Sequence, residues 1–259
     1  HADPLEAVGF KAYASALSDV AAMGIEATAG VAAVVLPRGT SYDDARRLEA
    51  GLRRAAERFA APLVGGDVTT GDSPLVLTVT AWGQSDGSVA PLLRSSARVG
   101  HRVLVTGELG GSLLGRHLEP EPRLAFAAAL NRAFTIGAAI DISDGLAGDV
   151  GHVMKRSGVG AAIDAARVPV SAAARQAAER SGRETLWHAL HDGEDFELLF
   201  TAAAEEARRI VADPPLGVPV TDIGEIVEGN ELTLRHEDGR TERLNPRAFE
   251  HRMGPKEDR

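Results

Sequence analysis

The chain has 259 residues and 44% hydrophobic content, enough for one large α/β unit or two subdomains with a real core. Its formal net charge of −9 argues against nucleic acid or an anionic membrane surface as the main partner. The absence of cysteine excludes disulfides, thiolate metal sites and cysteine nucleophiles, and fits a cytoplasmic protein.

Two further features of the whole chain bear on its context. No apolar run approaches the ~18 residues that a membrane-spanning helix needs. The chain begins with His1 rather than Met and shows no signal peptide, so we expect it to be a piece of a longer protein.

The first part of the chain alternates helical and extended patterns. Apolar residues at helical spacing predict a helix over 4–23, and a second, amphipathic helix is expected to begin after Ser41 and to run to Phe59. Short apolar runs predict strands, and the strand before Gly65 should end in a glycine-rich turn. These strands cover residues 31–36, 63–64 and 75–80.

We place a subdomain boundary near residue 97, which divides the chain into 1–97 and 98–259. The later part also alternates strands and helices, so the fold class is α/β or α+β with mixed sheets. The predicted strands are 103–107, 139–142, 196–201 and 218–226, the helices are 146–157, 171–181 and 203–212, and residues 232–244 form a hairpin that turns at 237–239.

The densest acidic stretch leads directly into the predicted strand 196–201. Glu194, Asp195 and Glu197 place three carboxylates within four residues there. Carboxylates crowded beside a buried strand repel one another unless a metal, a cationic ligand or hydrogen-bond donors hold them. A plain solvated turn before a strand is the alternative interpretation.

Other acidic residues also stand near the ends of predicted elements. Asp19 lies in the first helix between apolar residues. Gly66 and Asp67 belong to a turn whose backbone N–H groups could approach phosphate and whose side-chain oxygens suit Mg²⁺. An ordinary glycine-rich turn remains the alternative there.

The segment 141–145 (DISDG) joins a predicted strand to a predicted helix. Ser143 is a natural N-cap and Asp144 suits the first helical turn, so capping explains both without a function. Capping does not explain Asp141, which should share a side of the strand with Ser143 and form a metal or nucleotide edge. Arg94 could clamp a phosphate, although an exposed arginine is the commoner case.

Several familiar catalytic signatures are missing from the sequence. It contains no G-x-x-x-x-G-K-[ST] loop, no protein-kinase signature and no H-E-x-x-H pair. Scattered aspartates, glycine-rich turns and an acidic chain instead favour Mg²⁺-dependent phosphoryl transfer, in which metal ions neutralise the phosphates and the protein positions them.

The chain resembles the thiamine-monophosphate kinase family, in the superfamily that includes aminoimidazole ribonucleotide synthetase. Five motifs carry the resemblance, in order along essentially all 259 residues: 17–24 (LSDVAAMG), 65–70 (GGDVTT), 105–107 (VTG), 141–146 (DISDGL) and 193–200 (GEDFELLF). The resemblance implies a two-subdomain fold with mixed sheets, a homodimer formed through the first subdomain, and transfer of the γ-phosphate of ATP to thiamine monophosphate, giving thiamine diphosphate.

The resemblance also implies roles for individual residues, with no covalent nucleophile among them. His1 matches the histidine that closes the family's D-x-x-V-x-G-x-H motif. The implied Mg²⁺ ligands are Asp19, Asp67, Asp141 and Asp144; the implied ATP contacts are Gly66, Asp67, Arg94 and Ser143; and the implied thiamine monophosphate contacts are His1, Glu194, Asp195 and Phe249.

The sequence departs from the family pattern in three respects, the smallest being that residues 25–27 (IEA) replace the usual Ala/Gly-x-Pro after the Met-Gly pair. The amino-terminal segment with its G-D-D turn, which supplies further metal ligands, is absent, so we expect the 259-residue chain to be weakly active or inactive and a longer parent to be active. Equal rates for the two would contradict this. Asp192 also stands where the family usually has Gly, which adds negative charge beside Glu194 and Asp195.

Two alternatives stay open at this point. The chain could be another ATP-dependent enzyme of the same superfamily, although 193–200 favours the thiamine branch. It could also be a non-catalytic nucleotide-binding or dimerisation module, against which the intact Asp67, Asp141 and Asp144 argue.

Overall fold

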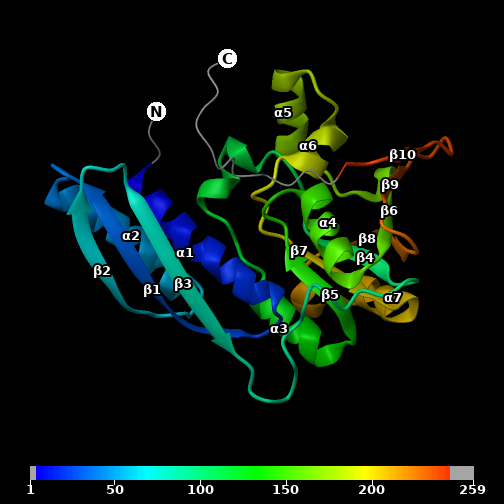
Figure 1. The fold of residues 1–259 in the computed structure, drawn as a ribbon, viewed down its shortest axis with the longest axis horizontal. Coiled ribbons are helices and arrows are strands. Elements are labelled where there is room, and N and C mark those ends of the chain that lie inside the picture. The colour runs from blue at the N-terminus through cyan, green and yellow to red at the C-terminus, as the bar shows by residue number, and fades with distance from the viewer. Residues whose placement is uncertain (1–3, 246–259) are drawn as a thin grey trace.

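The computed structural model describes residues 4–245, which form two units, each built on its own β-sheet (Figure 1). The first unit has a three-stranded sheet in the order β2-β1-β3. A parallel pairing joins β1 to β2 across helix α2, and an antiparallel pairing joins β1 to β3. Its elements are α1 (Leu5–Ala22), β1 (Glu26–Pro37), α2 (Tyr42–Arg58), β2 (Leu63–Gly71) and β3 (Val76–Gln84).

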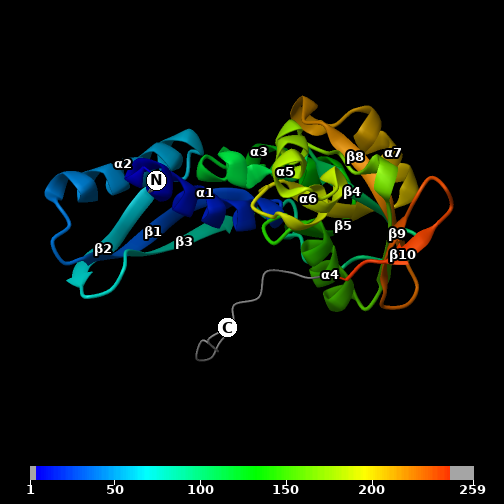
Figure 2. The same cartoon turned by 90° about the horizontal axis from the view of Figure 1, so that it is seen from above.

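Both helices of the first unit lie on one face of its sheet, as Figure 2 shows. The apolar face of α2 buries Leu48 and Leu52, and its first turn is capped by Ser41, whose Oγ accepts the Asp44 N–H at 3.1 Å. Helix α1 ends just before Gly24, which adopts φ +64°, a value that glycine tolerates.

The second unit has a seven-stranded sheet in the order β10-β9-β6-β8-β4-β7-β5. Its pairings are antiparallel except for β6 with β9. The strands are β4 (Arg102–Thr106), β5 (Ile136–Asp141), β6 (Gly160–Asp164), β7 (Leu198–Ala202), β8 (Val220–Val227), β9 (Leu232–Arg235) and β10 (Thr241–Arg243). The helices are α3 (Leu124–Ala133), α4 (Leu146–Ser157), α5 (Ala172–Ser181), α6 (Thr185–His191) and α7 (Ala204–Ala212), with short 3₁₀ turns η1 (Ser112–Leu114), η2 (Arg116–Leu118), η3 (Ala165–Arg167) and η4 (Pro215–Gly217).

Two apolar clusters cover this larger sheet, and the second of them reaches into the first unit. One cluster packs α4 and α6 against the sheet through residues such as Val150 and Leu190. The other packs Phe126 of α3 and Ile210 of α7 against the sheet together with Ala21 of α1. Because the carboxyl end of α1 is part of this core, Ser18 and Asp19 are carried to the edge of the second sheet.

Most of the predicted elements are confirmed, including the helix over 146–157 and the hairpin within 232–244. The predicted glycine turn at 65–67 is wrong, because β2 continues through it to Gly71. The sequence patterns missed α3, α6 and β6. Strand β3 ends at Gln84 and β4 begins at Arg102, so the change of sheet falls between them; the division at residue 97 stays a prediction. None of the helices within 4–245 is long and apolar enough to cross a membrane.

Candidate functional site

The carboxyl end of β5 meets the carboxyl end of α1 at a buried hydrogen bond. Ser18 Oγ donates to Asp141 Oδ2 at 2.7 Å, and both side chains are buried. Asp19, the next residue of α1, is exposed to a neighbouring cleft. The long helix of the first unit therefore brings a carboxylate beside the strand end of the second.

This cleft, which we call the first cleft, has a volume of about 310 Å³. It is lined by residues from α1, from the segment before β4, from the end of β5 and from α4. The structure thus gathers five of the predicted site residues in one place: Asp19, Arg94, Asp141, Ser143 and Asp144.

The loop between β5 and α4 is held by a residue that the sequence analysis did not select. Asp149 Oδ2 accepts the backbone N–H groups of both Ser143 and Asp144, each at 3.1 Å. The predicted N-cap role of Ser143 is wrong, because Gly145, with φ +99°, occupies that position and no side chain within 4–245 caps α4. Ser143 and Asp144 are therefore held in the cleft, ahead of the helix.

The carboxylates of the first cleft are crowded and poorly solvated. Burial raises the pKa of Asp141 to about 6 and that of Asp149 to about 8, and the neighbouring carboxylates add to both shifts. Burial also raises the pKa of Asp19, while the Arg94 guanidinium opposes that rise. Such a group of oxygens is stabilised by a cation, and carboxylate oxygens are the ligands that Mg²⁺ prefers.

The residues present thus fit a Mg²⁺ ion by their donor type. Ligand atoms of Asp144, Asp149 and His152 lie within 4.8 Å of one another, and His152 Nε2 is 3.7 Å from Asp144 Oδ2. The nitrogen of His152 suits Mg²⁺ less well than the carboxylates do. Asp19, Asp141 and Asp144 are the oxygen donors that could hold the ion.

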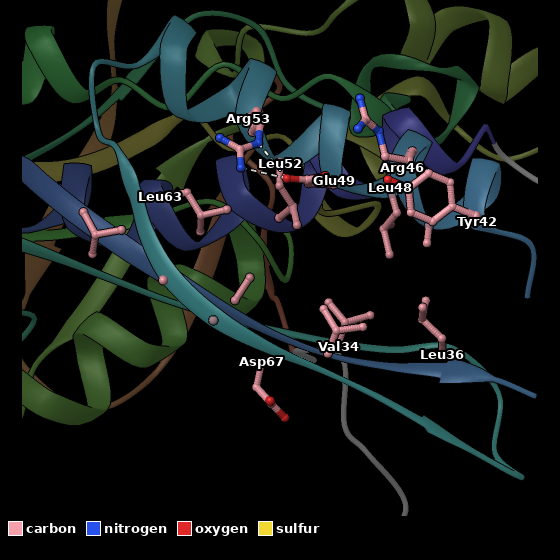
Figure 3. Close-up of a pocket in the computed structure, with 16 residues that line it drawn as sticks. Val34, Leu36, Tyr42, Arg46, Leu48, Glu49, Leu52, Arg53, Leu63 and Asp67 are labelled. Atoms are coloured by element: carbon pink, nitrogen blue, oxygen red, sulfur yellow. Dashed lines mark hydrogen bonds and ion pairs between the residues drawn. The ribbon is translucent and has the colours of Figure 1, made fainter.

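Gly66 and Asp67 do not lie in this cleft. They line a separate groove of about 510 Å³ between α2 and the small sheet. Figure 3 shows the Asp67 side chain directed to the opposite side of the strands from Leu48 and Leu52. A Cβ on Gly66 would lie 2.1 Å from the carbonyl oxygen of Ala32, so close strand pairing accounts for this glycine. Within 4–245, the structure does not bring Asp67 to Asp141.

A second cleft, of about 780 Å³, adjoins the first and shares Ser143 and Asp144 with it. Its other lining residues come mainly from η1, from α6 and the turn after it, and from the end of the described chain: Leu113, Arg183, Trp187, His191, Asp192, Glu194, Leu244 and Asn245. The Arg183 guanidinium stacks over the Trp187 ring at 3.9 Å from its centroid. Aromatic, cationic and acidic groups therefore face one space.

The acidic stretch at 193–197 is a strained turn rather than a plain solvated one. Glu194 and Phe196 have φ values of +54° and +52°, which are unusual for residues other than glycine. Each of its carboxylates has a cation from the protein itself. Lys11 Nζ is 2.5 Å from Glu194, Arg116 pairs with Asp195, and Arg123 Nη2 is 2.6 Å from Glu197.

Asp195 faces the protein interior rather than a cleft. Its carboxylate accepts the Gly110 N–H at 2.9 Å as well as the Arg116 guanidinium, and its side chain has no exposed surface. Burial raises the pKa of Asp195 to about 7 in spite of Arg116. The implied direct contact with substrate is therefore not available in this arrangement, because the oxygens already have partners inside the protein. Glu194 does line the second cleft. His1 and Phe249 lie outside the described residues.

Several residues that line the first cleft or pair with the carboxylates of 194–197 were not predicted from the sequence. Asp149 and His152 stand one turn apart on a correctly predicted helix, so helical spacing could have found them. Lys11 also lies on a predicted helix, but nothing in the sequence links it to Glu194. Arg116 and Arg123 fall in a segment without a predicted strand or helix, and no sequence signal indicated them.

Comparisons with known families match both parts of the chain. The N-terminal domain of AIR synthase related proteins matches residues 1–85, and the C-terminal domain of the same proteins matches residues 95–237.

Individual relatives match over most of their length. The chain is 42% identical over 247 residues to a thiamine-monophosphate kinase from Rhodopirellula baltica, covering 95% of this chain and 77% of that protein. The crystal structure of thiamine-monophosphate kinase from Stenotrophomonas maltophilia superimposes with a TM-score of 0.78 at 36% identity, covering 91% of this chain and 79% of that one. A structure described as AaThiL complexed with AMPPCP and TMP gives a TM-score of 0.81 at 28% identity, covering 96% of this chain and 82% of that one. The chain therefore belongs to the thiamine-monophosphate kinase family of AIR synthase related proteins.

Proposed function

We propose that this protein binds ATP with Mg²⁺ in the first cleft and transfers the γ-phosphate to thiamine monophosphate held in the second, giving thiamine diphosphate. The main support for this proposal is that Ser143 and Asp144 line both clefts. A donor phosphate and an acceptor phosphate bound on either side of these residues would lie next to each other, as direct transfer requires. The related structure with AMPPCP and TMP supports the same pair of ligands.

The chain's own residues would bind and orient the reactants. Asp19, Asp141 and Asp144 would hold Mg²⁺, and Arg94 and Ser143 would contact the phosphates of ATP. A bound Mg²⁺ would offset the negative charge of the phosphates. The attacking group is an oxygen of the substrate phosphate, so no side chain needs to form a covalent bond to phosphorus.

The acceptor would lie against Glu194 in the second cleft. Lys11, which pairs with Glu194, would fix that carboxylate from the first unit. We keep His1 and Phe249 as proposed contacts to thiamine monophosphate. Asp195 becomes a residue that positions Arg116 and the Gly110 turn. A cytoplasmic location and the division into 1–97 and 98–259 stay predictions.

We propose further that the protein is a homodimer formed through the open face of the small sheet. Helices α1 and α2 cover the other face (Figure 2). Along β1 the buried residues 32, 34 and 36 alternate with 31, 33 and 35, which therefore lie on the open face and pair there with 80, 78 and 76 of β3. Asp67 pairs with Ala33 and belongs to the same face. A half-apolar open sheet face is a suitable surface for binding a second copy of the chain. We keep Asp67 as a proposed Mg²⁺ ligand, and Gly66 and Asp67 as proposed ATP contacts; both roles would then be exercised at or near that interface.

Isothermal titration with a nonhydrolysable ATP analogue tests the first cleft. In the protein as its natural gene encodes it, we expect Mg²⁺-dependent binding that Asp144→Asn weakens by about tenfold or more, because a ligand of the ion is lost. His236→Asn, on the hairpin formed by β9 and β10, is the matched control and should bind as the wild type does. An affinity for the analogue that does not depend on Mg²⁺, or that is the same in Asp144→Asn as in the wild type, would refute the proposed site.

A further inference from the structure

Asp192, at the end of helix α6, binds a glycine turn beside the second cleft. Its Oδ2 accepts the Gly111 N–H at 2.8 Å. Its two carboxylate oxygens lie 2.9 and 3.0 Å from His188 Nδ1, and His188 Nε2 lies 2.7 Å from Ser181 Oγ. A continuous chain of hydrogen bonds therefore runs from Gly111 through Asp192 and His188 to Ser181.

Each polar side chain in this series of hydrogen bonds has a partner. In the tautomer that carries its proton on Nδ1, the His188 ring donates to Asp192 and accepts from Ser181 Oγ, and His188 is buried. The order Ser–His–Asp matches that of a hydrolase triad, but Ser181 is the last residue of α5, where the helix dipole disfavours an alkoxide. Its Oγ already accepts the Arg183 N–H at 3.2 Å. The geometry suits holding a structure in place rather than nucleophilic attack.

The turn at Gly110 and Gly111 is wedged between two helices. Both residues have positive φ values, +85° and +71°. A Cβ on Gly110 would lie 2.7 Å from the backbone nitrogen of Ala189 in α6, and one on Gly111 would lie 2.3 Å from the backbone of Ala173 in α5. The two successive N–H groups bind carboxylates of the protein itself, Gly110 that of Asp195 and Gly111 that of Asp192.

The glycine turn leads directly into one wall of the second cleft. Ser112 Oγ donates to the Gly193 carbonyl at 2.5 Å, and the next residue, Leu113, lines the cleft together with Asp192 and Trp187. A shift of the turn would therefore move Leu113, which lines the space in which the acceptor is proposed to lie.

We propose that Asp192, oriented by His188, is a positioning residue that fixes the Leu113 wall of the second cleft and thereby sets the affinity for the acceptor substrate. Asp192 and His188 are not among the residues that line the first cleft, so the ATP side should be unaffected. The link to the acceptor rests on the proposed function, whereas the positioning of the turn does not.

Steady-state kinetics of Asp192→Ala, His188→Ala and the double variant test the link to the acceptor. We expect the KM for thiamine monophosphate to rise on the order of tenfold, with the KM for ATP and kcat within about twofold of the wild type. The double variant should raise this KM by no more than the larger of the two single changes, because the two residues act as one unit. Asp192→Asn should largely restore the wild-type KM, since its amide oxygen can accept the Gly111 N–H while its NH₂ donates to the other tautomer of His188.

Hydrogen exchange tests the positioning itself, without turnover. In Asp192→Ala, amides in 108–118 should exchange faster while those of β1 stay unchanged, and the control His236→Ala, on the β9–β10 hairpin, should alter neither. Three results would overturn the inference. They are unchanged exchange in 108–118, additive increases of the KM for thiamine monophosphate in the double variant, and faster exchange with an unchanged KM. A wild-type protein that does not act on thiamine monophosphate would instead refute the proposed function and leave the exchange experiment decisive for the turn.

Discussion

Two groups of carboxylates in this protein differ in what balances their charge. Glu194, Asp195 and Glu197 each pair with a lysine or arginine of the chain. In the first cleft, by contrast, Arg94 is the one lysine or arginine among the described lining residues, and it faces several aspartates. The need for an external cation therefore falls on the first cleft rather than on the acidic turn, although the turn is the more conspicuous feature of the sequence.

Asp149 provides a test at the scale of one residue. Its pKa rises from 3.8 in the unfolded chain to about 8 in the fold, so between pH 4 and pH 8 the folded state keeps a proton that the unfolded state has lost. The free energy of unfolding should therefore fall as the pH rises through this window. Asp149→Asn cannot ionise, and its amide oxygen can still accept the N–H groups of Ser143 and Asp144.

We expect Asp149→Asn to gain stability relative to the wild type by up to ~1 kcal/mol per pH unit between pH 5 and pH 7. Urea unfolding in the absence of Mg²⁺, at several pH values, measures this difference. The exposed Asp213→Asn serves as the control and should follow the wild-type profile. Parallel profiles for Asp149→Asn and the wild type would show that Asp149 ionises as an ordinary carboxylate.

At the scale of elements, α1 determines how the site is assembled. One of its faces packs on α2 and the small sheet, and its carboxyl end enters the core of the second unit. Close contact between α1 and α2 depends on glycine: a Cβ on Gly51 of α2 would lie 1.9 Å from the carbonyl oxygen of Glu6, and one on Gly9 of α1 would lie 2.2 Å from that of Leu48.

Gly51→Ala should therefore lower the free energy of unfolding by about 2 kcal/mol through overpacking. Helix propensity alone predicts the opposite sign, a gain of about 1 kcal/mol for this substitution. Chemical denaturation distinguishes the two, with Ala50→Ser on the exposed side of the same helix as the control. A stabilised Gly51→Ala variant would show that the two helices are not in close backbone contact.

The elements that could be predicted from the sequence are those with a strong local pattern. Helix α2 has an amphipathic face and a serine cap, and α4 follows a recognisable strand-to-helix segment. The turn predicted at Gly65 failed because glycine also serves where strands approach closely, which depends on the neighbouring strand β1.

The candidate site could be predicted only in part, for a similar reason. Asp19, Asp141 and Asp144 lie within motifs of the family, and all three line the first cleft. The partners Lys11, Arg116 and Arg123 lie 183, 79 and 74 residues from the carboxylates that they hold, and no local pattern records such contacts.

At the scale of the whole molecule, the open face of the small sheet predicts self-association. Val76 is 46% exposed on this face, so Val76→Lys would place a charge in the proposed interface. We expect light scattering to show a dimer for the wild type and a monomer for Val76→Lys. Val211→Lys, at a comparably exposed position on α7, is the matched control and should remain dimeric. A wild-type monomer, or a dimer that tolerates Val76→Lys, would contradict an interface on this face.

We propose that the two clefts, which meet at Ser143 and Asp144, carry out one phosphoryl transfer. Incubation of the full protein with γ-labelled ATP, Mg²⁺ and thiamine monophosphate, followed by separation of the products, tests it most directly. We predict labelled thiamine diphosphate in the presence of Mg²⁺, with the rate reduced on the order of 100-fold in Asp144→Asn. Label released only as inorganic phosphate, or an equal yield of thiamine diphosphate from Asp144→Asn, would show that the two clefts do not carry out this transfer.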